Sequence, residues 1–119
     1  MIRFATFIGI VLCVAGCTST QPRTTPEKWQ GLQTKLRTDP AFRKAAIEDC
    51  AGNVDRNTPQ QDKHRIAALN HIPLNSFSKT LCTRIWNGVA ENRIKYDVYL
   101  KLRGDRSTWS YHKALQSMK

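Results

Sequence analysis

Acidic residues are scarce in this chain. Nine aspartate and glutamate residues stand against nineteen lysine and arginine residues, and the formal net charge is +10. Only Glu27, Glu48 and Glu91 are glutamates. A hydrolase that works by acid–base catalysis needs carboxylates in a cleft, one of them with a raised pKa. No motif surrounds these three residues, since Glu27 follows a helix start and Glu48 lies among bases at helical spacing. The composition therefore disfavours this class of enzyme.

Other signatures of catalysis and cofactor binding are missing from the sequence as well. It has no Gly-x-Ser-x-Gly elbow, no glycine-rich phosphate loop and no Cys-x-x-Cys-His haem attachment motif. The three histidines, His64, His71 and His112, have no neighbouring nucleophile in the sequence. We therefore expect a protein that is not an enzyme, with no catalytic residue and no cofactor. The alternative is a small peptidoglycan-active hydrolase or its accessory factor, with Glu48 or Glu91 as the acid.

The sequence also lacks an apolar run of the roughly 20 residues that a membrane-spanning helix needs. Its most apolar stretch, residues 4–15, follows Arg3 and ends in small side chains just before a cysteine. A positive residue, a short apolar stretch and small residues at its end are typical of a secretory signal peptide.

The end of this stretch resembles the lipobox of bacterial lipoproteins. Val14, Ala15, Gly16 and Cys17 match its order of aliphatic, small, small and cysteine, although Leu is commoner at the first position. The resemblance implies that residues 1–16 are removed and that Cys17 carries fatty acyl chains. Two or more such chains anchor a protein stably in a membrane. The alternative is an ordinary secretory signal in which Cys17 has no special role.

The residues after the lipobox bear on location. In lipoproteins an acidic residue after the lipidated cysteine often marks retention in the inner membrane, whereas here Thr18 stands in that position. The resemblance therefore implies the outer membrane, facing the periplasm, rather than the inner membrane. Residues 17–25 contain the lipidated cysteine and a polar stretch without apolar residues, which we expect to be a disordered tether. The domain proper is expected over residues 26–119.

By the same resemblance, two cysteines lie in an oxidising compartment. With Cys17 lipidated and the leader removed, Cys50 and Cys82 have only each other to pair with. Because disulfides persist in the periplasm, we expect this bridge. A metal site that also uses His64 and His71 is the alternative, but the spacing matches no zinc module, and we expect no metal.

The domain has the pattern of an α-helical protein. At positions 25–26, 39–40 and 58–59 a threonine or aspartate precedes a proline, as at a helix N-cap. Apolar residues then recur at spacings of three and four. Residues 93–96 alternate between basic and apolar or aromatic side chains, as a strand does, but four residues are weak evidence for one. The expected helices cover about residues 26–37, 40–51, 59–70, 78–88, 97–104 and 108–119.

The expected helix ends depend on single residues. Thr58 is expected to form a capping box with Gln61. Ser78 and Asp97 are expected to start the fourth and fifth helices, and Ser107 or Thr108 the last. Gly52 is expected to end the second helix, and the fourth is expected to end near Gly88 or slightly later. The cysteines at 50 and 82 fall on the apolar faces of their helices. We therefore expect an all-α fold: a compact bundle of five or six short helices with one interhelical disulfide.

Positive charge is concentrated near the C-terminus, where residues 93–119 hold seven basic and two acidic residues. Such a surface attracts anions. Because a lipid-anchored periplasmic chain meets little nucleic acid, we expect an acidic protein or an anionic envelope component as partner, and no nucleic acid. A basic surface without a dedicated partner is the simpler alternative. The candidate binding residues are Arg93, Lys95, Lys101, Arg103, Arg106, Trp109, Tyr111 and Lys113.

These features predict a membrane-anchored periplasmic lipoprotein that acts as a non-catalytic interaction module. Envelope maintenance, secretion-system assembly, and inhibition of or immunity to a toxin all fit such a protein. The sequence does not distinguish among them.

Overall fold

The computed structural model describes residues 25–119, so the signal peptide, Cys17 and nearly all of the expected tether lie outside the described residues. The described part is all-α and contains no strand, which confirms the predicted fold class. Residues 93–96 connect two helices and begin the second of them. None of the described helices is long and apolar enough to cross a membrane. The elements are α1 (Pro26–Thr38), α2 (Pro40–Asn57), α3 (Gln60–Asn70), the short 3₁₀ helix η1 (Leu74–Ser76), α4 (Phe77–Ala90), α5 (Tyr96–Gly104) and α6 (Thr108–Ser117).

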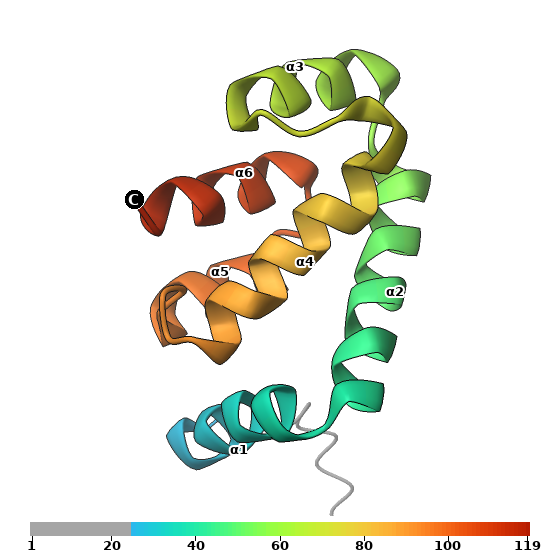
Figure 1. Cartoon of the computed structure of the whole chain (residues 1–119). Helices are drawn as coiled ribbons and strands as arrows, with labels where there is room; N and C mark the ends of the chain where they lie inside the picture. Colours follow the sequence, from blue (N-terminus) through green and yellow to red (C-terminus); the bar gives the residue numbers. More distant parts are fainter. Residues whose placement is uncertain (1–24) are drawn as a thin grey trace, which may run out of the picture.

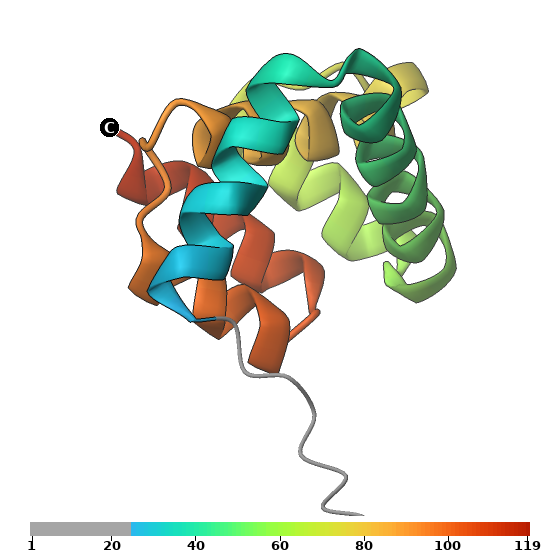
Figure 2. The same ribbon diagram turned by 90° about the horizontal axis from the view of Figure 1, so that it is seen from below.

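Helix α4 is the centre of the bundle. It contacts α1, α2 and α6, while α5 and α3 each pack against α6. Figure 1 shows α4 running through the middle of the molecule, with α1 and α3 at opposite ends of the long helix α2. Seen from below in Figure 2, α1 lies across the bundle in front of the other helices. The largest fully buried side chains come from four of these helices and the turn before α5: Leu36, Val54, Ile66, Phe77, Leu81, Cys82, Val89 and Ile94.

Three helices begin where a local cap was predicted. The side chain of Thr25 accepts a hydrogen bond from the backbone N–H of Lys28 at 3.3 Å. That of Asp39 accepts one from Phe42 at 3.0 Å, and Ser107 caps α6 in the same way. A cap of this kind contributes about 1 kcal/mol, because it satisfies a backbone donor that the helix leaves free.

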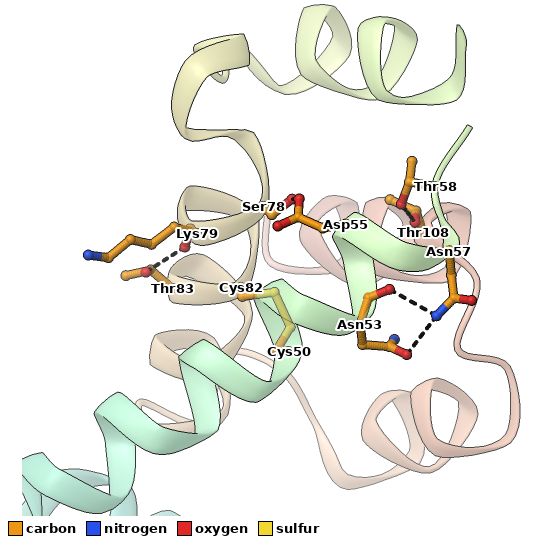
Figure 3. Close-up of a disulfide and its surroundings, with 10 residues drawn as sticks. All are labelled: Cys50, Asn53, Asp55, Asn57, Thr58, Ser78, Lys79, Cys82, Thr83 and Thr108. Carbon is orange, nitrogen blue, oxygen red and sulfur yellow. Dashed lines mark hydrogen bonds between the residues drawn. A yellow bond between two sulfur atoms is a disulfide. The ribbon is translucent and has the colours of Figure 1, made fainter. Parts of the chain in front are cut away.

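Three other predicted helix starts are wrong, and two of the side chains, Thr58 and Ser78, bond elsewhere in the fold. The hydroxyl of Thr58 hydrogen-bonds that of Thr108, and α3 begins at Gln60 without a side-chain cap. Ser78 lies inside α4, where its hydroxyl donates to the carboxylate of Asp55 (Figure 3). Asp97 lies within α5, which begins one residue earlier.

One predicted helix end is also wrong. Helix α2 continues past Gly52, and this places Val54, which is 1% exposed, in the core. Helix α4 ends at Ala90, slightly after Gly88, as predicted. The left-handed backbone conformation belongs instead to His71 (φ 52°), just after α3, and to Asn92 (φ 57°), just after α4. Burial of apolar side chains in the next turn therefore outweighs the tendency of glycine to end a helix.

The predicted disulfide is present. Cys50 on α2 and Cys82 on α4 are bonded, with their Cα atoms 5.8 Å apart, and both side chains are buried (Figure 3). The bridge joins α2 and α4, the pair of helices with the most extensive contact in the bundle.

Polar contacts fix α6, which carries several of the predicted binding residues. The buried side chain of Asn70, at the end of α3, hydrogen-bonds the Nδ1 atom of His112 at 2.9 Å. The side-chain amide of Gln116 donates to the oxygen of the same asparagine at 3.2 Å. Together with the contact between Thr58 and Thr108, these bonds hold α6 against α3 and the end of α2.

Replacing glycine by alanine is expected to have opposite effects at two helical positions. A Cβ at Gly31 meets nothing within 4 Å, so Gly31→Ala should stabilise the protein by about 0.5–1 kcal/mol through helix propensity. A Cβ at Gly88 lies 2.4 Å from Met118 Sδ and 3.0 Å from Ile94 Cγ1, and Ile94 is fully buried. Gly88→Ala should therefore destabilise by about 1 kcal/mol or more, because overpacking outweighs propensity. Urea unfolding of both variants measures the difference, and changes of equal sign would contradict it.

Candidate functional site

A pocket of about 240 Å³ lies beside the disulfide, between α2, α4, α5 and α6. We call it the arginine pocket. One part of its lining is apolar and comes from Ile85, Val89 and Leu102. Its aromatic, polar and charged lining residues are Asp49, Asn53, Trp86, Tyr99, Arg103, Arg106 and Tyr111.

Two arginines give this pocket its positive charge. Arg103 lies near the end of α5, and Arg106 lies in the connection to α6. The guanidinium of Arg103 donates a long hydrogen bond of 3.5 Å to the hydroxyl of Tyr99. Over residues 25–119 the ion pairs are Lys44–Glu48 and Arg93–Glu91, so neither guanidinium in the pocket is paired with a carboxylate. Both forks keep N–H donors for an anion.

An aromatic cluster supports the pocket from one side. The ring of Tyr99 lies 4.8 Å from that of Trp29 and 6.4 Å from that of Trp86. The indole Nε1 of Trp86 is buried and has no hydrogen-bond partner, and within the described chain it is the only buried side-chain nitrogen or oxygen in that state. An unsatisfied buried donor of this kind costs about 1–3 kcal/mol of stability.

Tyr111 brings a hydroxyl to the same pocket. Burial raises the pKa of Tyr111 above its usual value, and the nearby Asp49 carboxylate raises it further. A hydrogen bond with Asn53 and the positive charge of Arg106 lower this pKa in opposition. Because the overall direction is upward, the phenol is protonated at neutral pH and offers both a donor and an acceptor.

The structure brings together only some of the predicted binding residues. Arg103, Arg106 and Tyr111 line the arginine pocket. Lys101 and Lys113 line a separate hollow of about 490 Å³ between α5 and α6.

The other three predicted binding residues line neither hollow. Arg93 is ion-paired with Glu91 at 2.8 Å, and Lys95 is exposed just before α5. Trp109 is half-buried, with its ring edge-on to that of His112 at 5.7 Å. The eight predicted residues thus occupy several separate places on the surface.

Asp49, Asn53 and Trp86 also line the pocket and were not among the predicted binding residues. They lie on α2 and α4, far along the chain from the basic segment. No local pattern could have identified them, because only the packing of α2 and α4 against α5 and α6 brings them to the arginines.

A third hollow, of about 400 Å³, lies among bases of α1, α2 and α4. Its two arginines already serve the fold: Arg37 donates to the carbonyl of Ala90 at 2.9 Å, and Arg43 donates to that of Leu36 at 2.7 Å. Its lysines, Lys44 and Lys79, are exposed. The guanidiniums of this hollow therefore already bond backbone carbonyls of α4 and α1. They leave fewer N–H donors for an anion than the guanidiniums of the arginine pocket.

The groups considered for catalysis or metal binding are dispersed. Glu48 and Glu91 are exposed and lie in ion pairs, unlike the buried carboxylate of a general acid. His64 and His71 are exposed as well. Over residues 25–119, no three histidine, cysteine, aspartate or glutamate side chains gather as a metal site would require.

Comparison with known proteins finds no matching family model, no similar curated protein and no similar solved structure. A function for this chain therefore rests on its own residues.

Proposed function

We propose that the protein is a lipid-anchored, non-catalytic binding module of the bacterial cell envelope, and that it docks an anionic partner through the arginine pocket. The observation that carries this proposal is the meeting of Arg103 and Arg106 with Trp86 and Tyr111 at one pocket. Tryptophan, tyrosine and arginine are the residues most enriched where binding energy is concentrated in protein interfaces.

The charge of the chain supports an anionic partner. Its net charge of +10 attracts negative surfaces over distances beyond direct contact. At the pocket, guanidiniums without a carboxylate partner can bind an anion without first breaking an ion pair. Long-range charge then speeds the encounter, and the pocket provides the specific contact.

The lipobox-like residues and the disulfide support the envelope as the location. Val14–Cys17 fits the processing of a lipoprotein, and Thr18 favours the outer membrane. The bond between Cys50 and Cys82 agrees with an oxidising compartment such as the periplasm.

Replacing the proposed lipidation site is expected to release the protein from membranes. A serine at position 17 has no thiol to form the thioether, so Cys17→Ser should leave the membrane pellet, whereas Cys13→Ser, in the removed leader, should stay there. Fractionation and immunoblotting of cells that express each variant measure this, and a density gradient tests whether the wild type follows the outer membrane. Retention of the Cys17→Ser protein in the membrane fraction would contradict the proposal.

The alternative, a peptidoglycan hydrolase that uses Glu48 or Glu91, is less well supported, because both carboxylates are exposed and paired with bases. A zymogram against purified peptidoglycan tests it. Clearing that is lost in Glu48→Gln or Glu91→Gln would overturn the non-catalytic proposal.

A further inference from the structure

We infer that the arginine pocket accepts a single carboxylate, supplied by a glutamate or aspartate side chain of a partner protein. The inference rests on the proposed function, in which this pocket docks an anionic partner, and it names the chemistry of that contact. It depends on the size of the pocket, its charge balance and its guanidinium donors.

The size of the pocket favours one inserted side chain. Its volume of about 240 Å³ is below the roughly 300–1,000 Å³ typical of sites for small molecules. An oligosaccharide or a whole lipid head group would extend beyond the pocket, whereas one side chain fits inside it. The apolar residues of its lining are largely buried, and the small apolar surface that they leave can contact the methylene groups of a glutamate.

The charge balance favours one negative charge over two. Arg103 and Arg106 together contribute two positive charges, and Asp49 on the same lining takes one away. A monoanionic carboxylate matches this balance, whereas a phosphate dianion meets the repulsion of Asp49. The planar guanidinium fork also suits the two oxygens of a carboxylate, which it binds with parallel hydrogen bonds.

The donors of the pocket favour an occupant with several acceptor oxygens. The guanidiniums of Arg103 and Arg106 both lie on its lining, and neither is paired with a carboxylate. An ionised carboxylate accepts about four hydrogen bonds and donates none. It can therefore bond both guanidiniums at once, which a neutral amide with one oxygen does less well.

The test uses the full-length Cys17→Ser protein, labelled with ¹⁵N, and follows the indole N–H resonance of Trp86. The probe is blocked glutamate, N-acetyl-glutamate N-methylamide, and blocked glutamine is its neutral counterpart. For a ligand of about 14 non-hydrogen atoms, the expected Kd is about 1 mM. The Trp86 resonance should shift saturably with glutamate while those of Trp29 and Trp109 stay in place. Glutamine should bind at least about tenfold more weakly, because it lacks the negative charge that the guanidiniums attract.

Two double variants separate the pocket from general charge. Arg103→Gln with Arg106→Gln should raise the Kd at least about tenfold. Lys44→Gln with Lys79→Gln removes the same charge from exposed positions outside the pocket and should change it by less than about twofold. Circular dichroism confirms that each variant is folded.

Each contrary outcome has a distinct meaning. No saturable shift with glutamate, equal binding of glutamine, or equal losses in the two double variants would overturn the inference. If glutarate bound more tightly than blocked glutamate, the natural ligand would be a small diacid and not a partner protein, and the inference would be wrong. If inorganic phosphate bound more tightly than blocked glutamate, the ligand would not be a carboxylate, but the partner would still be anionic. If neither anion bound, the docking role would be lost from the proposed function as well.

Discussion

Replacing both Cys50 and Cys82 by alanine is expected to lower the free energy of unfolding by about 3.7 kcal/mol. The bridge closes a loop with a sequence separation of 32, and the chain-entropy model assigns about this much to a loop of that size. A small domain has only about 5–15 kcal/mol of net stability. The melting temperature should therefore fall by roughly 15–30 °C. Urea and thermal unfolding followed by circular dichroism measure both quantities.

Reduction provides the matched control for this variant. The wild type unfolded in the presence of dithiothreitol should lose a similar amount of stability, and the alanine variant should not respond to the reductant. A loss of less than about 1 kcal/mol in both experiments would contradict the stabilising role of the bridge.

Replacing Phe77 by alanine should cost about 3–5 kcal/mol. Its side chain is 1% exposed and is one of the fully buried residues at the start of α4. The ammonium of Lys63, on α3, lies 5.9 Å from the centre of its ring. The variant therefore loses a large buried ring at the contact between α3 and α4 and leaves a cavity that these helices only partly close.

Leu74→Ala is the control for this substitution, because Leu74 lies on η1 just before α4 and is 43% exposed. Its truncation should cost less than about 1 kcal/mol. Urea unfolding compares the two variants. Similar losses for both would mean that Phe77 does not contribute to the core as described.

The predictable part of the fold depends on residues that act over a few positions. Thr25, Asp39 and Ser107 cap the helices that follow them, so their identity and spacing were sufficient. Thr58 has the same side chain as Thr25, yet it bonds a residue 50 positions away. Ser78 likewise bonds Asp55 across two helices. Such contacts depend on how the helices pack against one another. Local sequence preferences carry no information about that packing.

Some residues of the candidate site were likewise predictable from the sequence, and others were not. Charge clustering along one segment identified Arg103 and Arg106, because basic residues near one another in sequence produce a positive surface in most folds. The contribution of Trp86 depends instead on its packing in α4, which leaves its ring half-buried on the lining of the pocket. In a sequence, an aromatic residue at helical spacing is most simply a core residue, and nothing local distinguishes one that also lines a pocket.

The envelope location, and with it the kind of partner, depends on the processing of the N-terminus. The most direct test is the intact mass of the protein purified in detergent from membranes of its native host. The proposal predicts a chain that begins at Cys17 and carries the added mass of fatty acyl groups on that residue. A chain that retains Met1 and carries no acyl group would contradict it.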